Sequence, residues 1–290
     1  MVTTDPERTP GTASGAGANG GGREPLRARA RVAVKATGIA TTLLGLYAAW
    51  RGLRPAARRV GLERPLRALA FQGWARTSLR LLGVRLEVEG TPPRGPCLLV
   101  ANHLGYLDIA TLGARHPGAV FVSMAEVADW PVMGRIARDV DTVFVPRDRR
   151  HAVGEVARAI EAQLRAGRTV VLFPEGKSGD GTALRPFQTA LLEPAARLGA
   201  PVAWAAIAYE TPADAPPAAE AVCWTDDAPF HTHLLRMMRL PRVRARLVYG
   251  GAVLTETDRK RLARRLEEEV AALLAPRPAP SRARGRAPGG

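Results

Sequence analysis

Short apolar runs recur through the middle of the chain and predict the strands of a sheet. Each run is five to eight residues long and is bounded by glycine, proline or charged residues, which is typical of buried strands. The runs occupy residues 97–101, 119–123, 142–146, 169–173, 201–208 and 243–249. Segments with helical periodicity, such as 155–164 and 191–198, separate them. This alternation indicates one α/β domain with a largely parallel or mixed β-sheet covered by helices.

Two helical segments with membrane character precede this domain. Residues 36–50 carry no charge and are flanked by Lys35 and Arg51. The run is shorter than the ~20 apolar residues that a spanning helix needs, so a span, a re-entrant helix and an interfacial helix all stay open. Residues 66–82 mix leucine and tryptophan with arginine. That mixture suits a helix lying among lipid headgroups, and equally a helix packed on the domain.

The two ends of the chain lack apolar periodicity and predict disordered tails. The first 30 residues are rich in glycine, threonine, alanine and proline, and the last 15 add arginine to such a composition. We therefore expect four parts: a tail at 1–30, a membrane-associated helical segment at 31–82, the main domain at 83–275 and a basic tail at 276–290.

The net charge of the chain indicates an anionic binding partner. The 290 residues carry a formal net charge of +15, which suits nucleic acid or an anionic membrane. Arginines flank the apolar helices, and no helix-turn-helix, zinc-finger or RNA-binding signature is present, so the membrane is favoured and nucleic acid is not expected. Apart from His103, the histidines lack a matching acid or cysteine at metal spacing, so no metal site is predicted; these are His116, His151, His231 and His233. The two cysteines, Cys97 and Cys223, are expected to be free thiols.

His103 and Asp108 are the first candidate catalytic pair. They follow the apolar run at 97–101, so Asn102 and His103 would lie at the end of a strand, where α/β folds place ligand chemistry. A histidine acts as a general base near neutral pH when a carboxylate fixes its tautomer and orientation. The spacing also fits a helix-capping arrangement, so it predicts a base only together with other motifs.

A second motif follows the run at 169–173. The sequence Pro174-Glu175-Gly176-Lys177 places a carboxylate and a cation in a turn just beyond a predicted strand. Neither a nucleotide-binding P-loop nor a nucleophile elbow fits this segment, because the glycine that each motif requires at a fixed distance is missing.

A third motif delivers an arginine at the end of the run at 142–146. Arg147 offers a rigid fork of donors that suits phosphate or carboxylate, so it is a candidate anion-binding residue. The alternative is a solvated charge run, which we prefer for the neighbouring Arg149 and Arg150.

In this order, the motifs resemble those of the glycerolipid acyltransferase family, the lysophosphatidic acid acyltransferases and their relatives. The resemblance covers about residues 66–250 and rests on four blocks. These are Asn102-His103 with Asp108, Phe144-Val145-Pro146-Arg147, Phe173-Pro174-Glu175-Gly176 and a partial fourth, Ala200-Pro201-Val202. The resemblance implies that His103 takes the proton of the acceptor hydroxyl and that Asp108 orients His103. It also implies that Arg147 holds the acceptor phosphate, while Glu175 and Gly176 position the glycerol part.

Four positions depart from the family pattern and put the acceptor headgroup in doubt. An expected lysine is Met124, an expected glycine before the second block is Asp141, the basic residue after Gly176 is shifted to Lys177, and an expected proline is Trp204. The segments 178–181 and 223–227 look similar to the branch of the family that acts on lyso-ornithine lipids.

The resemblance thus predicts an enzyme of phospholipid biosynthesis on the cytoplasmic side of the cell membrane. Its acceptor would be a lysophospholipid, foremost 1-acylglycerol 3-phosphate, with a lyso-ornithine lipid as the alternative. The donor would be acyl-CoA or acyl carrier protein, and no cofactor is needed because a thioester is already activated. A rival of another class is a non-catalytic lipid-binding protein of the membrane, against which the pairing of His103 with Asp108 argues.

Overall fold

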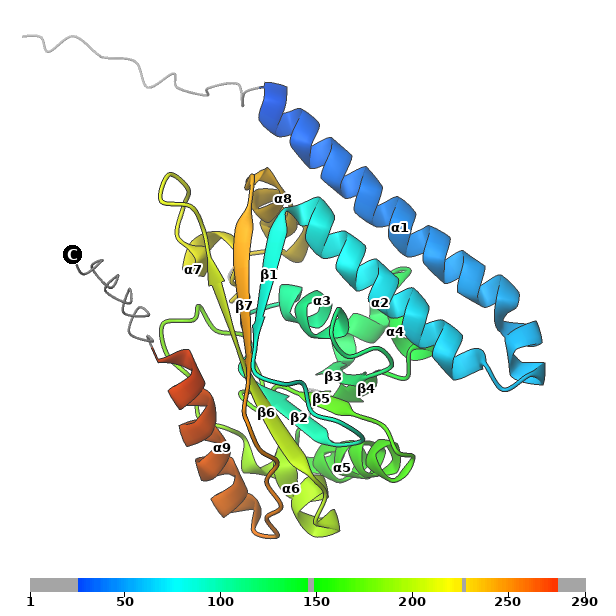
Figure 1. Ribbon diagram of the computed structural model, residues 1–290, viewed down its shortest axis with the longest axis vertical. Helices are drawn as coiled ribbons and strands as arrows, with labels where there is room; N and C mark the ends of the chain where they lie inside the picture. The colour runs from blue at the N-terminus through cyan, green and yellow to red at the C-terminus, as the bar shows by residue number, and fades with distance from the viewer. Residues whose placement is uncertain (1–25, 146–148, 226–227, 276–290) are drawn as a thin grey trace, which may run out of the picture.

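The computed structural model describes residues 26–145, 149–225 and 228–275, with the backbone alone for residues 149–153. A seven-stranded sheet lies at its centre with helices on both faces, and two long helices lie along one side (Figure 1). The strands are β1 (Val84–Glu89), β2 (Leu98–Ala101), β3 (Val120–Met124), β4 (Val143–Val145), β5 (Val170–Leu172), β6 (Val202–Glu210) and β7 (Val243–Tyr249). The helices are α1 (Leu26–Arg59), α2 (Glu63–Leu82), α3 (Leu107–Gly113), the 3-10 helix η1 (Ala125–Asp129), α4 (Met133–Asp139), α5 (Arg149–Arg165), α6 (Thr189–Leu198), α7 (Ala218–Ala221), α8 (Phe230–Arg239) and α9 (Arg259–Leu274).

The strand order β1-β7-β6-β2-β5-β3-β4 gives a mixed sheet. Neighbouring strands are parallel except β6 and β7, which are antiparallel. All six apolar runs identified in the sequence form strands, which confirms the predicted α/β class. The sequence analysis missed β1, because only Val84 of this edge strand is buried and charged residues alternate along the rest.

Alternating side chains of the central strands enter two separate cores. In β2, Leu99 and Ala101 belong to the core that includes Leu79 of α2 and Leu112 of α3. Leu98 and Val100 belong to the opposite core, which includes residues of α5, α6 and α9. A strand buried on both faces reads as a continuous apolar run, which is why the sequence revealed it.

Helices α1 and α2 form an antiparallel hairpin. Gly38 of α1 lies against Leu81 of α2, and Gly73 of α2 lies against Leu46 of α1, so small residues let the two helices approach. The helix α1 begins at Leu26, earlier than the sequence analysis placed the end of the tail, because alanine and arginine favour helix formation. The rest of both predicted tails lies outside the described residues.

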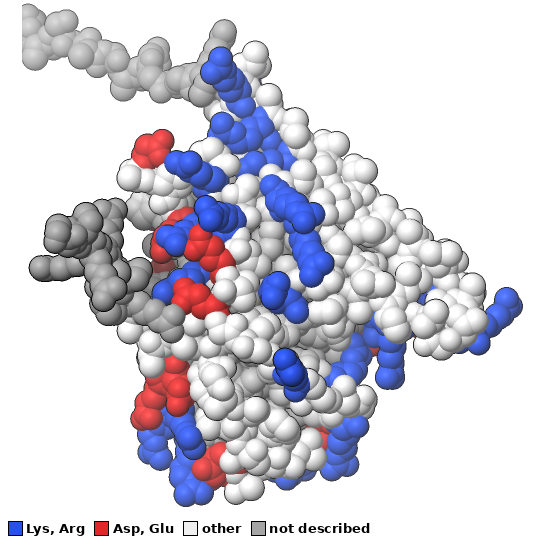
Figure 2. Space-filling view, in the orientation of Figure 1, with Lys and Arg blue, Asp and Glu red and all other residues white. Residues whose placement is uncertain are grey.

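The middle of α1 is apolar and largely exposed. Val34, Leu44 and Leu53 are exposed, and α1 is the one helix in the described chain that is long and apolar enough to cross a membrane. Figure 2 shows that Lys and Arg side chains gather toward the two ends of this helix and leave its middle uncharged. The helix nevertheless packs along α2, so a membrane-associated hairpin fits the structure.

Lys35 attaches α1 to the rest of the protein. Its buried side chain donates to the carbonyl oxygens of Leu82 and Leu240, each at 2.7 Å. Leu82 ends α2 and Leu240 follows α8, so one ammonium satisfies carbonyl groups at two helix C-termini.

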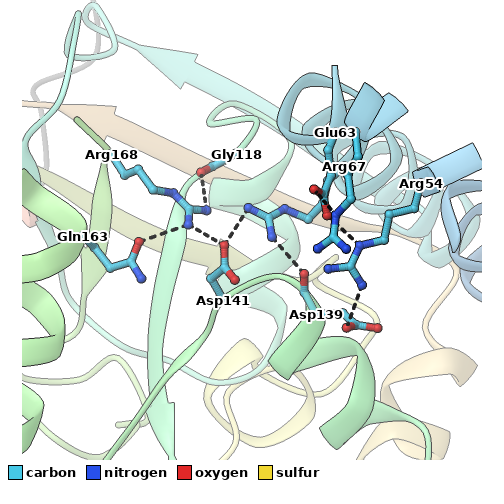
Figure 3. Close-up of polar contacts among 9 residues, drawn as sticks. Arg54, Glu63, Arg67, Gly118, Asp139, Asp141, Gln163 and Arg168 are labelled. Atoms are coloured by element: carbon cyan, nitrogen blue, oxygen red, sulfur yellow. Dashed lines mark hydrogen bonds and ion pairs between the residues drawn. The ribbon is translucent and has the colours of Figure 1, made fainter. Parts of the chain in front are cut away.

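A second attachment joins the hairpin to the segment before β4 (Figure 3). Arg54 of α1 binds Glu63 of α2 at 2.6 Å, and Arg67 of α2 donates to the carbonyl oxygen of Asp139 at 3.0 Å. The Asp141 carboxylate lies 2.7 Å from Arg67 and 2.6 Å from Arg168.

Asp141 stands where the family resemblance predicts glycine, and its backbone adopts the positive φ of 61° that favours glycine. Burial raises the pKa of the Asp141 carboxyl, but the hydrogen bonds from Arg67 and Arg168 outweigh burial and hold that pKa below its usual value. The carboxylate thereby compensates for the unfavourable backbone conformation with two ionic contacts.

The link between the hairpin and the sheet is a single residue. Helix α2 ends at Leu82 and β1 begins at Val84, leaving Gly83 between them with a φ of 77°. A Cβ on Gly83 would come within 2.5 Å of the Pro241 carbonyl oxygen, so only glycine fits this joint.

Candidate active site

The candidate residues gather at the C-terminal ends of three neighbouring strands, β2, β5 and β6. Asn102 and His103 follow β2 directly, Glu175 follows β5, and Tyr209 lies near the end of β6. In an open α/β sheet this edge is where ligands bind.

Asn102 ties β2 to β6. Its side-chain oxygen accepts from the Ile207 N–H at 2.7 Å, and its side-chain nitrogen donates to the Ile207 carbonyl at 2.9 Å. Asn102 is only 3% exposed, so its amide continues the pairing of the two strands and fixes where His103 begins.

The imidazole of His103 is held on two sides. Its Nδ1 lies 2.7 Å from Oδ2 of Asp108, and its ring stacks on Phe173 with the ring centroids 4.3 Å apart. The pairing leaves Nε2 as the ring nitrogen available to a substrate. This geometry is the one that a general base requires.

Asp108 is completely buried and fully hydrogen-bonded. Besides His103, its Oδ2 accepts from the N–H groups of Leu104 at 2.6 Å and Gly105 at 3.0 Å. Its Oδ1 accepts from the Tyr209 hydroxyl at 2.7 Å, and Tyr209 also contacts the Thr111 hydroxyl at 3.1 Å. Burial, then the charge of Asp108, raises the pKa of Tyr209 well above its usual value, so Tyr209 stays a neutral donor.

Glu175 joins the turn after β2 to the loop that carries Arg185. One carboxylate oxygen accepts from the His103 N–H at 2.7 Å and the other from the Arg185 N–H at 2.9 Å. Burial raises the pKa of Glu175 above its usual value although both hydrogen bonds act in the opposite direction. Gly176 adopts a φ of 73°, and a Cβ there would overlap the Gln188 side chain.

A cavity of about 490 Å³ opens at His103. Its polar end is formed by His103, Glu175 and Asp180, and its apolar part by alanines, leucines and an isoleucine from the 179–184 loop, β6, α7 and the end of α9. Such a cavity can hold the hydrocarbon chain of a bound lipid while the polar end of that lipid faces the imidazole. The apolar lining includes Ala183, Leu184, Ile207, Ala208, Ala218, Ala219, Ala271 and Leu274.

Two predicted basic residues are not placed beside His103. Arg147 lies outside the described residues, and the exposed Lys177 is not among the residues that line the cavity. Instead, Arg185 approaches the site: its Nε lies 3.9 Å from the position that a Cβ would take on Gly179, whose N–H donates to the His103 carbonyl at 2.8 Å. The sequence analysis gave no role to Arg185 or to Tyr209, which follows the predicted strand 201–208, and it named Asp180 only as part of the segment 178–181.

Metal ligands are absent from the described part of the chain, where no group of three or more His, Cys, Asp or Glu side chains could hold an ion. Cys97 and Cys223 are both buried and free, and burial raises the pKa of the Cys223 thiol to about 12. Cys223 lines the cavity as a neutral side chain.

Comparison with known proteins identifies close matches. A family model described as Acyltransferase matches residues 84–208. The chain is 34% identical to the lyso-ornithine lipid O-acyltransferase of Rhodobacter capsulatus, over 84% of this chain and 90% of that protein. It is 34% identical to the protein of the same name from Pseudomonas aeruginosa, over 85% of this chain and 93% of that one.

Other relatives carry a different substrate in their names. The chain is 30% identical to the 1-acyl-sn-glycerol-3-phosphate acyltransferase of Neisseria meningitidis, over 68% of this chain and 77% of that protein. The crystal structure of the 1-acyl-sn-glycerophosphate acyltransferase PlsC from Thermotoga maritima superposes with a TM-score of 0.66 at 16% identity, covering 87% of this chain and 98% of that one. At that identity the structure supports the fold alone.

Proposed function

The chain belongs to the acyltransferase family, and we propose that it moves a fatty acyl group from a thioester to the hydroxyl of a lyso-lipid with His103 as the general base. The family membership makes the protein a lyso-lipid acyltransferase. The observation that supports the proposed mechanism is the buried Asp108 at 2.7 Å from Nδ1 of a histidine that lines the cavity.

The proposed reaction uses the two nitrogens of His103 differently. Nε2 takes the proton of the acceptor hydroxyl while the hydroxyl oxygen attacks the carbonyl carbon of the thioester. Asp108 stabilises the imidazolium that forms on His103. The C–S bond then breaks, and the imidazolium returns its proton to the departing thiolate. No metal or redox group enters this scheme, because the thioester supplies the activated carbonyl.

Four backbone N–H groups near His103 are already engaged and are not free to bind the developing oxyanion. The N–H groups of His103, Leu104 and Gly105 already donate to Glu175 or Asp108, and that of Gly176 donates to the Phe173 carbonyl. Glu175, with both oxygens engaged, acts in this proposal as a brace between the turns, and Asn102 and Gly176 shape the backbone around His103.

For the acceptor, we propose a lyso-ornithine lipid. The relatives that cover most of this chain at 34% identity bear that name. The charged side chains that line the cavity in the described chain are the carboxylates of Glu175 and Asp180, which suit an acceptor carrying an amine better than a phosphate.

A second candidate acceptor is 1-acylglycerol 3-phosphate. A relative of that name matches 68% of the chain, and Arg147 and Lys177 are the residues that would hold the phosphate. In this case Arg147→Ala should raise the acceptor KM strongly and leave the donor KM nearly unchanged.

We propose acyl-CoA or acyl carrier protein as the donor and the cytoplasmic side of the cell membrane as the location. The exposed apolar side chains of α1 support membrane association. Its packing along α2 supports a hairpin that lies in the membrane surface.

The test is an assay of the purified full-length protein in mixed micelles or vesicles. Lyso-ornithine lipid and 1-acylglycerol 3-phosphate are each offered with labelled acyl-CoA and acyl carrier protein thioester. We expect the ornithine acceptor to react with the higher kcat/KM and His103→Ala to abolish the transfer to it. Transfer by His103→Ala at the wild-type rate would contradict the mechanism.

A further inference from the structure

The loop at residues 179–185, part of which lines the cavity, carries the exposed carboxylate of Asp180 and the exposed guanidinium of Arg185. Asp180 lines the cavity, and its Oδ1 accepts from both the N–H of Thr182 at 2.9 Å and the hydroxyl of Thr182 at 2.7 Å. This local turn fixes the carboxylate while leaving Oδ2 without a hydrogen-bond partner among the described residues.

Arg185 is fixed in a similar way at its backbone. Its N–H donates to Glu175, the same carboxylate that accepts from the His103 N–H. Arg185 is not itself among the residues that line the cavity, but its Nε lies 3.9 Å from the position that a Cβ would take on Gly179, which does line it. In the described chain its guanidinium makes no hydrogen bond or ion pair.

The two charges match a headgroup with two charges. Ornithine has two amines and one carboxyl, so an ornithine that is acylated on one nitrogen keeps one ammonium and one carboxylate. A carboxylate and an arginine held on one loop offer one partner to each, and arginine suits a carboxylate because its donors form a planar fork. A phosphate monoester would instead meet repulsion from Asp180.

We propose that Asp180 binds the ammonium and Arg185 the carboxylate of a zwitterionic amino-acid headgroup, and that this pair determines the acceptor specificity of the enzyme. The proposal rests on the proposed function, since it takes the cavity at His103 as the acceptor site. Neither side chain contacts the reacting atoms, so the pair should govern acceptor KM more than kcat.

The test removes each charge from the protein and from the substrate in turn. The acceptors are lyso-ornithine lipid, its methyl ester, its N-acetyl derivative and 1-acylglycerol 3-phosphate, all with one labelled acyl thioester. The variants are Asp180→Asn and Arg185→Gln in the full-length protein. Asn at 180 keeps an oxygen for Thr182, and Gln at 185 keeps the N–H that binds Glu175, so both variants should fold. Glu193→Gln and Arg259→Gln, at an exposed ion pair between α6 and the start of α9, are matched controls.

A substitution in the protein and a modification of the substrate that remove the same contact should not have additive effects on KM. We expect Asp180→Asn to raise the KM for lyso-ornithine lipid about tenfold and to leave the KM for the N-acetyl derivative unchanged, because that derivative has already lost the contact. Arg185→Gln should show the same relation with the methyl ester, and Asp180→Asn should lower the KM for 1-acylglycerol 3-phosphate. The controls should match the wild type.

The outcomes separate this proposal from the function on which it rests. Wild-type protein that acylates lyso-ornithine lipid while both variants keep its KM, or lose affinity equally for modified and unmodified acceptors, overturns the headgroup pair alone. Wild-type protein that acylates only 1-acylglycerol 3-phosphate overturns both the proposed acceptor and the pair. Transfer to none of the acceptors overturns the proposed acyl transfer itself.

Discussion

Replacing Asp108 with asparagine tests the proposed base through a change of one atom. The Oδ2 of Asp108 accepts from two backbone N–H groups, those of Leu104 and Gly105, in addition to His103. An amide nitrogen at that position would face two donors, and each unsatisfied buried donor costs about 1–3 kcal/mol. The asparagine must therefore place its oxygen there and its nitrogen toward the Tyr209 hydroxyl, which can accept it while donating to Thr111.

This orientation keeps the tautomer of His103 and removes only the charge. A hydrogen bond to a charged acceptor is stronger than a neutral one by about 1–1.5 kcal/mol. The full attraction between two unit charges about 4 Å apart is about 4 kcal/mol at an effective dielectric constant of 20. In the transition state the proton is only partly transferred to His103, so the imidazole carries only part of a unit charge and gains only part of this attraction. The expected loss thus lies between these values, near 2.7 kcal/mol, or about a hundredfold in kcat.

The measurement is kcat and kcat/KM on the purified variant, with its thermal unfolding as a check on the fold. Tyr209→Phe is the matched control, because it removes a hydrogen bond from Oδ1 of the same carboxylate and leaves His103 untouched. We expect it to lose activity only severalfold. Unchanged turnover of Asp108→Asn would refute His103 as the base, and a loss above about ten-thousandfold in a folded protein would refute the retained tautomer.

Three further predictions concern stability and the membrane. Burial, followed by the charge of Arg115, lowers the pKa of His116 to about 4. The unfolded chain therefore binds a proton that the folded chain does not, and the free energy of unfolding should fall by up to about 3 kcal/mol between pH 6.5 and 4. The fall should shrink in His116→Gln, and an equal fall in that variant would contradict the assignment. Lys35→Met should make α1 sensitive to protease while Val34→Met does not, because Lys35 and not Val34 binds the carbonyl groups at the ends of α2 and α8. Equal resistance of both variants to protease would exclude Lys35 as the residue that attaches α1. Full-length protein should stay on anionic vesicles in high salt, whereas protein without residues 1–60 should be released, since screening weakens arginine contacts but not apolar burial. Retention of the shortened protein in high salt would show that α2 itself is embedded.

The sequence predicted those features that depend on local pattern. Six strands could be located because each reads as a mainly apolar run, and β2, β5 and most of β6 are buried on both faces. The ends of β2 and β5 then brought His103, Asp108 and Glu175 to one edge. The edge strand β1 escaped because it is buried on one side only.

The contacts that complete the site are tertiary and leave no local signal. Tyr209 lies 101 positions from Asp108 in the chain, yet donates to its carboxylate. Arg185 follows a loop without periodicity, and its N–H donates to Glu175, the carboxylate that also accepts from the His103 N–H. Lys177, chosen because it stands one position from the expected arginine, is exposed, which shows how little a neighbouring position means in a tight turn.

The single residue Gly83 between α2 and β1 fixes the distance between the hairpin and the active site. In the proposed membrane-bound state, with only Gly83 between α2 and β1, the depth of the hairpin in the bilayer would also set the height of His103 above it. An enzyme on a flexible tether could search for headgroups at varying distance, whereas this one must draw its acceptor to a fixed level. Lipids that thicken or thin the interface should thus alter turnover even when their headgroups are identical.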